Sequence, residues 1–197
     1  MVQSPHTLDP AQSALLVMDL QRFKLGDFPQ RDGLLARTAA AIELARKKSV
    51  QVAYVWSAYN DLDYATVPDS NRHLLPAIRK GILHVDEPDS AIHEAVAPQE
   101  GDIVERKTRI GAFATTGLDE QLTNRGIFAL ILAGVFTSTT VLSTVRDAAD
   151  RDYELYLLED CVADRDPELH ELLVRRVLPT QAKIIKTGDL ESLIRPV

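Results

Sequence analysis

Residues 128–160 read FALILAGVFTSTTVLSTVRDAADRDYELYLLED, and this stretch decides the fold class. It opens with an apolar run at 128–134, passes through a Gly- and Thr-containing turn into a helical pattern at 139–151, and ends with a second apolar run at 154–160. Short apolar runs bounded by polar or turn residues are typical of buried strands. A strand, a helix and a strand in this order predict two parallel strands joined by a crossover helix.

The same alternation extends along the rest of the chain. Four further strands are expected at 13–18, 50–56, 102–106 and 182–186. Helices are expected at 31–48, 116–125 and 167–178, with a short closing helix at 187–194. Because strands and helices alternate, the sequence predicts an α/β fold with a six-stranded, mostly parallel sheet.

One segment departs from this pattern. Residues 57–101 are too long for a simple turn and contain short helical patches at 72–79 and 88–96. We interpret this segment as a lid or a substrate-facing excursion. No repeat or Gly/Ser linker interrupts the chain, so residues 1–197 are expected to form a single domain.

Composition excludes several classes of function. The net charge of −7, with Lys and Arg scattered, argues against a nucleic-acid partner. No signal peptide or membrane-spanning apolar run is evident, so we expect a cytoplasmic protein with no membrane partner. The single cysteine, Cys161, is interpreted as a small buried residue, and no Cys/His cluster has the spacing of a metal site.

Polar residues follow three of the expected strands. Asp19 comes directly after the first, Lys107 ends the third, and Gly134 precedes a Thr/Ser run that opens a helix. Ligands of parallel sheets bind beyond the carboxyl ends of the strands, so these residues predict a cleft. Apolar surroundings are expected to raise the pKa of Asp19. From position alone, each of these features has a purely structural alternative. Asp19 can equally cap a turn, Lys107 can face solvent, and the Thr/Ser run can serve as a helix cap and nothing more.

Taken together, three segments resemble the isochorismatase-like hydrolases, a superfamily that includes nicotinamidases and N-carbamoylsarcosine amidases. They are MDLQRF at 18–23, ERKTRIGAF at 105–113 and GVFTSTTVLSTVRDAADRDYELYLLEDCVAD at 134–164. The resemblance implies a Rossmann-like, three-layer α/β/α sandwich with strand order 3-2-1-4-5-6. It also implies a cofactor-independent enzyme with a small-molecule substrate and a homo-oligomeric state, a dimer or larger. No metal is expected, because the metal histidines of nicotinamidases are absent from SAYNDLD at 57–63.

The resemblance also assigns roles to individual residues. Asp19 matches the family's general acid/base carboxylate and Lys107 its lysine, whereas Thr140 occupies the position of the cysteine nucleophile. A cis peptide bond is implied between Val135 and Phe136. Substrate-lining candidates beside the motifs are Phe23, Trp56, Arg72, Arg109, Phe113, Val135, Phe136 and Thr139. Among them, Arg72 is interpreted as a carboxylate clamp, while His73 beside it is expected to be a packing or surface residue.

Because Thr140 replaces the cysteine nucleophile, three hypotheses about function stay open. The leading hypothesis is hydrolysis of a vinyl ether in a small, carboxylate-bearing substrate, which needs an acid and water but no covalent step. Asp19 would be the acid, and amides near Thr139 and Thr140 would stabilise charge. The second is a C–N amidohydrolase with Thr140 as nucleophile, although a threonine hydroxyl is a weak acid and β-branched. The third is a binding protein that retains the fold without catalysis.

Overall fold

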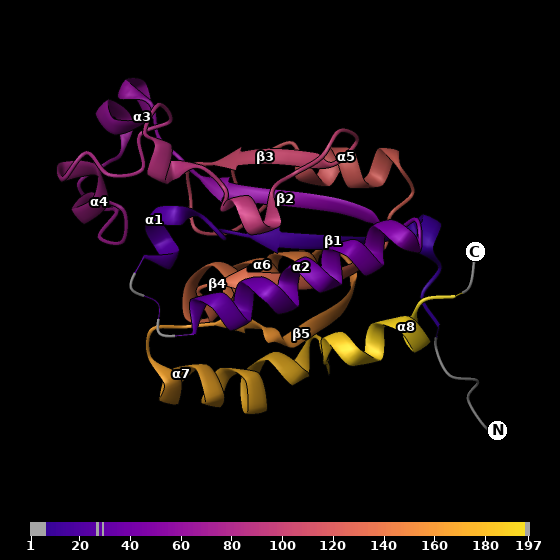
Figure 1. Ribbon diagram of the computed structural model, residues 1–197. Coiled ribbons are helices and arrows are strands. Elements are labelled where there is room, and N and C mark those ends of the chain that lie inside the picture. Colours follow the sequence, from indigo (N-terminus) through magenta and orange to yellow (C-terminus); the bar gives the residue numbers. More distant parts are fainter. Residues whose placement is uncertain (1–6, 27, 29, 196–197) are drawn as a thin grey trace.

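All strands of the described chain lie in one sheet (Figure 1). The computed structural model describes residues 7–195 apart from residues 27 and 29. The strands are β1 (Ser13–Met18), β2 (Gln51–Ser57), β3 (Ile103–Lys107), β4 (Ala129–Val135), β5 (Glu154–Ala163) and β6 (Lys183–Ile185). Their order is β3-β2-β1-β4-β5-β6, and each neighbouring pair is parallel. The predicted fold class and strand order are therefore confirmed.

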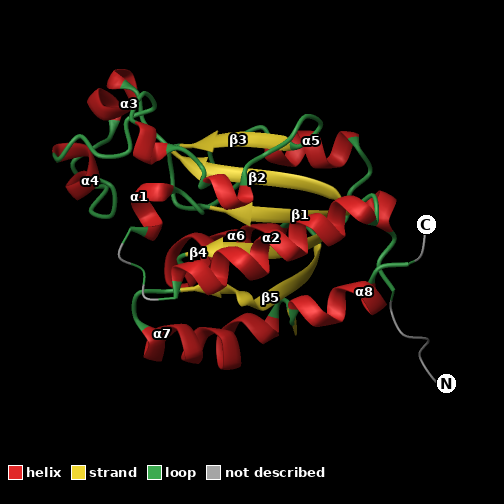
Figure 2. Ribbon diagram, in the orientation of Figure 1, coloured by secondary structure: helices red, strands yellow, loops and turns green. Residues whose placement is uncertain are grey.

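Helices cover both faces of the sheet (Figure 2). The α-helices are α1 (Arg22–Leu25), α2 (Arg31–Lys47), α3 (Asp61–Thr66), α4 (Leu75–Arg79), α5 (Leu118–Asn124), α6 (Leu142–Asp150), α7 (Pro167–Leu172) and α8 (Leu190–Leu193). Helices α2 and α8 share one apolar core with the sheet, and α5, α6 and the turn after α7 share the other. The result is the expected three-layer arrangement.

Burial on both faces explains why the strand sequences are continuously apolar. Successive side chains of a strand point to opposite faces. In β1, Leu15 and Val17 pack in the core under α2, while Leu16 and Met18 pack in the core under α6. A strand covered on both faces has no solvent-facing positions for polar residues, so the apolar run is unbroken.

Several element boundaries differ from the sequence predictions. The helix expected at 139–151 begins as a π-helical turn, Thr137–Val141, and continues as α6. The helix expected at 167–178 is α7 followed by a second π-helical turn, Leu173–Val177. The helical patch expected at 88–96 is two separate 3-10 turns, Pro88–Ser90 and Glu94–Val96. Helices α1 and α3 were not predicted, because four and six residues are too short to show a helical period.

The long excursion after β2 forms a cap beyond the carboxyl ends of the strands (Figure 1). We call residues 58–85 the cap segment. Its own small core contains Tyr59, Leu74 and Leu83, and the amide of Tyr59 donates to the carbonyl of Leu83 at 2.9 Å. Arg106 of β3 donates to the Asp63 carboxylate at 2.6 Å. These contacts hold the cap segment over the strand ends, where the polar residues of the motifs lie.

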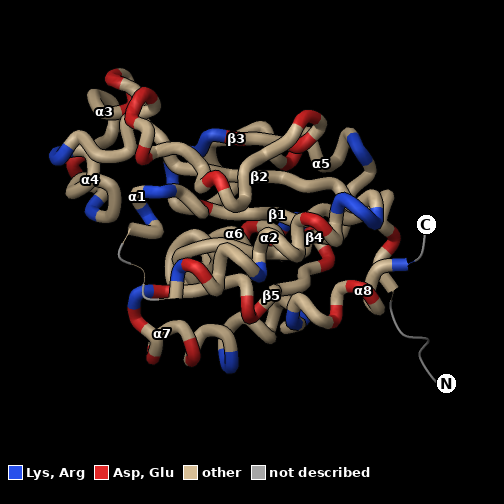
Figure 3. The backbone as a smooth tube through the Cα atoms, in the orientation of Figure 1, with Lys and Arg blue, Asp and Glu red and all other residues tan. Residues whose placement is uncertain are grey.

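Charged residues of both signs are interspersed along the backbone (Figure 3). Neither Lys and Arg nor Asp and Glu dominate the carboxyl edge of the sheet in this view. Among the described residues, no helix is long and apolar enough to cross a membrane.

Candidate functional site

Asp19 lies at the centre of the cluster beyond the strand ends. It leaves β1 with a φ of 60°, a left-handed conformation that Asp adopts more readily than most residues. Its side chain is fully buried. Oδ1 accepts a hydrogen bond from Ser57 Oγ at 3.1 Å, and Oδ2 accepts one from Thr140 Oγ1 at 2.6 Å. The predicted pairing of strand ends therefore places Asp19 and Thr140, 121 residues apart, in direct contact.

Lys107 reaches the same carboxylate from the end of β3. Its Nζ lies 2.9 Å from Asp19 Oδ2 and 2.9 Å from Ser57 Oγ. It also donates to the carbonyls of Arg109 at 3.3 Å and Ile110 at 3.0 Å. Strand β2 lies between β3 and β1, so the lysine side chain extends across the end of β2. Ser57, the last residue of β2, contacts both Lys107 Nζ and Asp19 Oδ1 through its hydroxyl. Lys107 is thus within hydrogen-bond reach of Asp19.

A second lysine, which the sequence analysis missed, completes the cluster. Lys24 of α1 places Nζ 2.8 Å from Asp19 Oδ2 and 2.8 Å from Ser57 Oγ. The turn that returns it to the strand end is held by Gln21, which exchanges hydrogen bonds with the backbone of Ser57 and also donates to the carbonyl of Ser90. The only signal in the sequence was a lysine one helical turn after Gln21, and α1 itself was not predicted.

The two ammonium groups decide the charge state of Asp19. Burial by itself would raise the pKa of this carboxyl, but Lys107 and Lys24, with the hydrogen bonds from Lys24 and Thr140, bring the pKa well below its ordinary value. The expectation of a raised pKa is wrong, because it considered burial without the neighbouring cations. For Lys24, burial lowers the pKa to about 8, even though Asp19 opposes the shift.

Strand β4 approaches β1 closely where it delivers Thr140. Gly134 has a φ of 136°, and a Cβ there would lie 2.1 Å from the carbonyl oxygen of Met18. Only glycine fits this position. The next peptide bond, between Val135 and Phe136, is cis. The chain then enters the π-helical turn, in which the amide of Thr139 donates to the carbonyl of Phe136 at 3.3 Å. The amide of Thr139 is therefore not free to stabilise charge on a substrate.

A cavity of about 130 Å³ lies above this cluster. Its lining residues come from α1, the end of β2, the cap segment, the end of β3 and the π-helical turn: Lys24, Ser57, Tyr59, His73, Leu74, Ala77, Leu83, Lys107, Arg109, Ile110, Phe136, Thr139 and Thr140. Five of the residues predicted for the site line it directly, namely Lys107, Arg109, Phe136, Thr139 and Thr140. His73, expected to be a packing or surface residue, is also part of the lining, and burial lowers its pKa.

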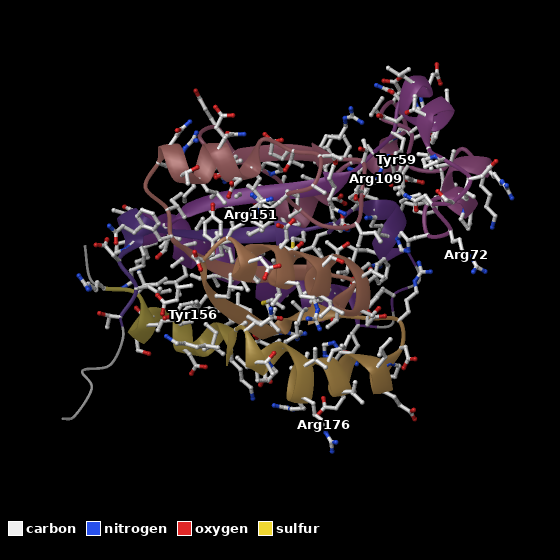
Figure 4. The ribbon with its side chains drawn as sticks, turned by 180° about the vertical axis from the view of Figure 1, so that it is seen from behind. Tyr59, Arg72, Arg109, Arg151, Tyr156 and Arg176 are labelled. Atoms are coloured by element: carbon white, nitrogen blue, oxygen red, sulfur yellow. The ribbon has the colours of Figure 1, made fainter. Side chains whose placement is uncertain are left out.

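Other predicted lining residues lie outside this cavity. Arg72 is exposed and points away from the body of the molecule, whereas Arg109 lies beside Tyr59 (Figure 4). Arg72 therefore does not line this cavity, and its role as a carboxylate clamp stays a prediction. Trp56 precedes Ser57 on β2, and neighbouring strand residues face opposite sides, so Trp56 is turned away from the cavity.

Three apolar candidates also fail to line the cavity. Phe23 is 41% exposed on α1, and Val135 is completely buried in the core of the sheet. Phe113 stacks on Tyr153, with ring centroids 5.9 Å apart, and the guanidinium of Arg151 lies over its ring. Proximity to a motif residue in sequence was a poor guide here, because neighbouring residues point in different directions in strands, helices and loops alike.

The single cysteine lies elsewhere. Cys161 of β5 is completely buried in the core under α2, and its Sγ is 3.2 Å from Thr187 Oγ1. Burial raises the pKa of the thiol, so it is held protonated. The interpretation of Cys161 as a buried residue is confirmed.

A larger hollow of about 520 Å³ lies at the opposite, amino-terminal ends of the strands. Its charged lining includes Arg46 and Asp102, which pair with each other at 2.6 Å. Its distance from the Asp19 cluster makes the smaller cavity the better candidate site. In residues 7–195 without 27 and 29, no three His, Cys, Asp or Glu side chains are grouped to hold a metal ion.

Comparison with known proteins agrees with the geometry. Residues 13–189 match the isochorismatase domain. The chain is 29% identical to the phenazine biosynthesis protein PhzD of Pseudomonas fluorescens, covering 93% of this chain and 86% of that protein. It is 31% identical to the ureidoacrylate amidohydrolase RutB of Rhizobium rhizogenes, covering 83% and 75%.

A solved structure of an isochorismatase family protein from Burkholderia thailandensis superimposes with a TM-score of 0.83 at 28% identity, covering 97% of this chain and 99% of that one. The domain match spans the sheet from β1 to the end of β6, and thus includes Asp19, Lys107 and Thr140. The chain belongs to the isochorismatase family.

Proposed function

We propose that this protein hydrolyses a vinyl ether in a small, carboxylate-bearing substrate by proton transfer and water attack, without a covalent enzyme intermediate. The observation that carries the proposal is the Asp19 carboxylate, buried beneath the cavity and bonded to two ammonium groups and the Thr140 hydroxyl, with the single thiol of the chain in another core. An acid–base reaction needs such a carboxylate, whereas a thioester reaction needs a thiol.

The reaction divides into proton transfer and hydration. Asp19 would donate a proton to the terminal carbon of the vinyl group, which leaves a cationic carbon stabilised by the ether oxygen. A water molecule bonds to that carbon and returns a proton to Asp19. The hemiketal then collapses, the bond to the leaving alcohol oxygen breaks, and that oxygen takes the hydroxyl proton.

Asp19 must first gain a proton, because Lys107 and Lys24 lower its pKa more than burial raises it. A substrate carboxylate in the cavity changes this balance in two ways. Its negative charge lies near that of Asp19, and it competes with Asp19 for the ammonium groups. Both effects raise the pKa of Asp19, so substrate binding prepares the acid. Lys107 would keep the carboxyl oriented throughout, since the ammonium is held by three further acceptors.

The test is a substrate panel offered to the wild-type protein, Asp19→Asn and Thr140→Ala. Isochorismate represents the vinyl ethers, and nicotinamide, ureidoacrylate and simple carbamoyl compounds represent the amides. We expect turnover of the vinyl ether, a loss of at least 100-fold in Asp19→Asn, and a change below 10-fold in Thr140→Ala. Hydrolysis of an amide alone, or no turnover of any substrate, would contradict the proposal, and the latter would favour a binding protein.

A second candidate is a C–N amidohydrolase in which Thr140 is the nucleophile. Two observations favour it: the 2.6 Å hydrogen bond from Thr140 Oγ1 to Asp19, which supplies a base, and the 31% identity to an enzyme named ureidoacrylate amidohydrolase. It ranks second because a carboxylate with a lowered pKa is a weak base for a threonine hydroxyl. An acyl-enzyme in mass spectra, lost in Thr140→Ala, would establish it.

A further inference from the structure

Two ammonium groups compete for a single carboxylate in this site. The Nζ atoms of Lys24 and Lys107 lie 2.8 and 2.9 Å from the same oxygen of Asp19, and both also contact Ser57 Oγ. One carboxylate neutralises one of them, so the cluster carries a surplus positive charge when both are protonated. Buried charge without a partner is unfavourable, and a bound anion would balance it.

The hydrogen bonds of the two lysines are not equivalent. Lys107 Nζ faces four acceptors, on Asp19, Ser57, Arg109 and Ile110, with three N–H groups. Its side chain is 1% exposed. No N–H of Lys107 is therefore left for a ligand.

Lys24 differs in both respects. Within the described part of the chain its Nζ has two acceptors, Asp19 Oδ2 and Ser57 Oγ, so one N–H remains. Its side chain is 12% exposed and lines the cavity. The other charged or titratable side chains that line the cavity are Lys107, Arg109, His73 and Tyr59, and none of these is an anion at neutral pH, since burial raises the pKa of Tyr59 to about 12. Lys24 can turn from Asp19 towards a ligand while Lys107 keeps Asp19 in place.

We infer that Lys24, and not Lys107, is the residue that binds the substrate carboxylate, and that it thereby determines the preference of this site for small carboxylates. The inference rests on the carboxylate-bearing substrate proposed above and specifies how that substrate is recognised. When the carboxylate enters, Lys24 exchanges Asp19 for the ligand. Asp19 retains Lys107, Ser57 and Thr140 as hydrogen-bond partners, while Lys24 pairs with the charge of the ligand.

Arg109 is the main rival for this role. It lines the cavity, and its Nη1 donates to the backbone carbonyl of Thr108 at 2.7 Å. Its guanidinium interacts electrostatically with Tyr59 and Asp63 of the cap segment. A carboxylate held by Arg109 alone would leave the contact between Lys24 and Asp19 in place. The two assignments therefore predict different variants to lose affinity.

The experiment measures binding without turnover. Benzoate and its uncharged analogue benzamide are titrated by calorimetry at pH 7 into the wild-type protein, Lys24→Met, Lys24→Gln, Arg109→Met and the control Lys47→Met, which changes an exposed lysine of α2. We expect both Lys24 variants to bind benzoate at least 10-fold more weakly, with benzamide affinity unchanged. The control should match the wild type. Circular dichroism checks that each variant is folded.

Proton uptake provides a readout that a purely structural role would not alter. At pH 8, Lys24 is partly deprotonated, and a bound carboxylate raises its pKa. Benzoate binding should then take up protons in the wild type, measured from titrations in buffers of different ionisation enthalpy, and take up markedly fewer in Lys24→Met. Uptake that is the same in both proteins would overturn the inference.

Other results would also overturn it. These are benzoate affinity unchanged in the Lys24 variants, loss of affinity in Arg109→Met alone, or no benzoate binding by the wild type at millimolar concentration. The outcomes separate the two proposals. Lys24-dependent binding without any hydrolysis would contradict only the proposed reaction. Hydrolysis with an unchanged kcat/KM in Lys24→Met would contradict only the inference.

Discussion

At the level of single residues, the charge of Asp19 is set by side chains from other elements. Burial alone favours a protonated acid, and the two lysines reverse that preference. Thr140 and Ser57 add hydrogen bonds to the two carboxylate oxygens. The same residue can therefore be an anion in the free protein and an acid in a complex, depending on where the lysine charges lie.

The first prediction concerns Asp19→Asn. The amide is nearly isosteric and tolerates the left-handed backbone, but it leaves two buried ammonium groups without a counter-charge. Removing one partner of a buried ion pair costs about 3 kcal/mol or more, so we expect the free energy of unfolding at pH 7 to fall by that order. Urea denaturation of both proteins measures the difference.

The pH dependence of that difference has a definite sign. The folded-state pKa of Asp19 is lowered, so its contribution is fully present above the ordinary pKa of a carboxyl group, about 4. As the pH falls from there through the folded-state value, the unfolded chain binds the proton first and the contribution is lost. The stability gap between wild type and Asp19→Asn should therefore shrink on acidification. A gap that is constant from pH 7 to 3 would contradict the assignment.

At the level of elements, the site depends on how closely β4 and β1 approach. The carboxyl ends of these strands carry the turn to Thr140 and the residue Asp19, and they meet at Gly134 and Met18. The cap segment is a second element-level feature, because it supplies one wall of the cavity and is held to the sheet by few polar contacts.

The second prediction concerns Gly134→Ala. The Cβ of the alanine would lie 2.1 Å from the carbonyl oxygen of Met18, and the alanine backbone would have to adopt a φ of 136°. Backbone atoms cannot move aside cheaply, so we expect a loss of about 3 kcal/mol or more, or failure to fold. Gly188→Ala is the matched control, because nothing lies within 4 Å of a Cβ there. Thermal unfolding measures both, and equal melting temperatures would contradict the argument.

The third prediction concerns Arg106→Gln. Arg106 joins β3 to the cap segment through the Asp63 carboxylate at 2.6 Å and the Ala58 carbonyl at 2.9 Å. Without it, the amides of residues 58–66 should exchange hydrogen faster, while those of β1 and β4 stay protected. Arg79→Gln, which removes an exposed pair at 3.7 Å, is the control. Exchange measured by mass spectrometry that is equal in both variants would show that Arg106 does not anchor the cap.

At the level of the whole molecule, one sheet with helices on both faces places all six strand ends at one edge. The cap segment covers that edge, and the smaller cavity lies between them. The opposite edge holds the larger hollow, whose Arg46 and Asp102 pair with each other. Because all strands of a parallel sheet run in the same direction, the candidate site lies at their carboxyl ends and the larger hollow at their amino ends.

The fourth prediction is a homo-oligomer, a dimer or larger, which the family resemblance implies. Large apolar side chains such as Phe128 and Leu172 are at least half exposed in the single chain, and association would bury such surface. Light scattering at several concentrations should give a multiple of 21.8 kDa. A mass of 21.8 kDa throughout would contradict this expectation. The cytoplasmic location and the single domain also stay predictions.

The local pattern of the chain determined the strands, most of the helices and two of the three central site residues. Apolar runs and helical periods involve neighbouring residues, so they are legible without the fold, and the strand ends then pointed to Asp19 and Lys107. The family resemblance added the strand order and Thr140. Boundaries were less certain, because the π-helical turns at Thr137–Val141 and Leu173–Val177 leave no separate signal.

Only the tertiary structure decided which side chains meet Asp19, and with them its charge. Lys24 lies on a helix of four residues, too short for any period, and Gln21 and Ser57 return it to the strand end. Trp56, Phe113 and Arg72 do not line the cavity, because the direction of a side chain is set by its packing against segments distant in sequence. Electrostatic interaction depends on distance in space, and the lysines that hold Asp19 ionised are 5 and 88 positions away in sequence. The sequence alone therefore located the central carboxylate of this site, while the fold determined its protonation state.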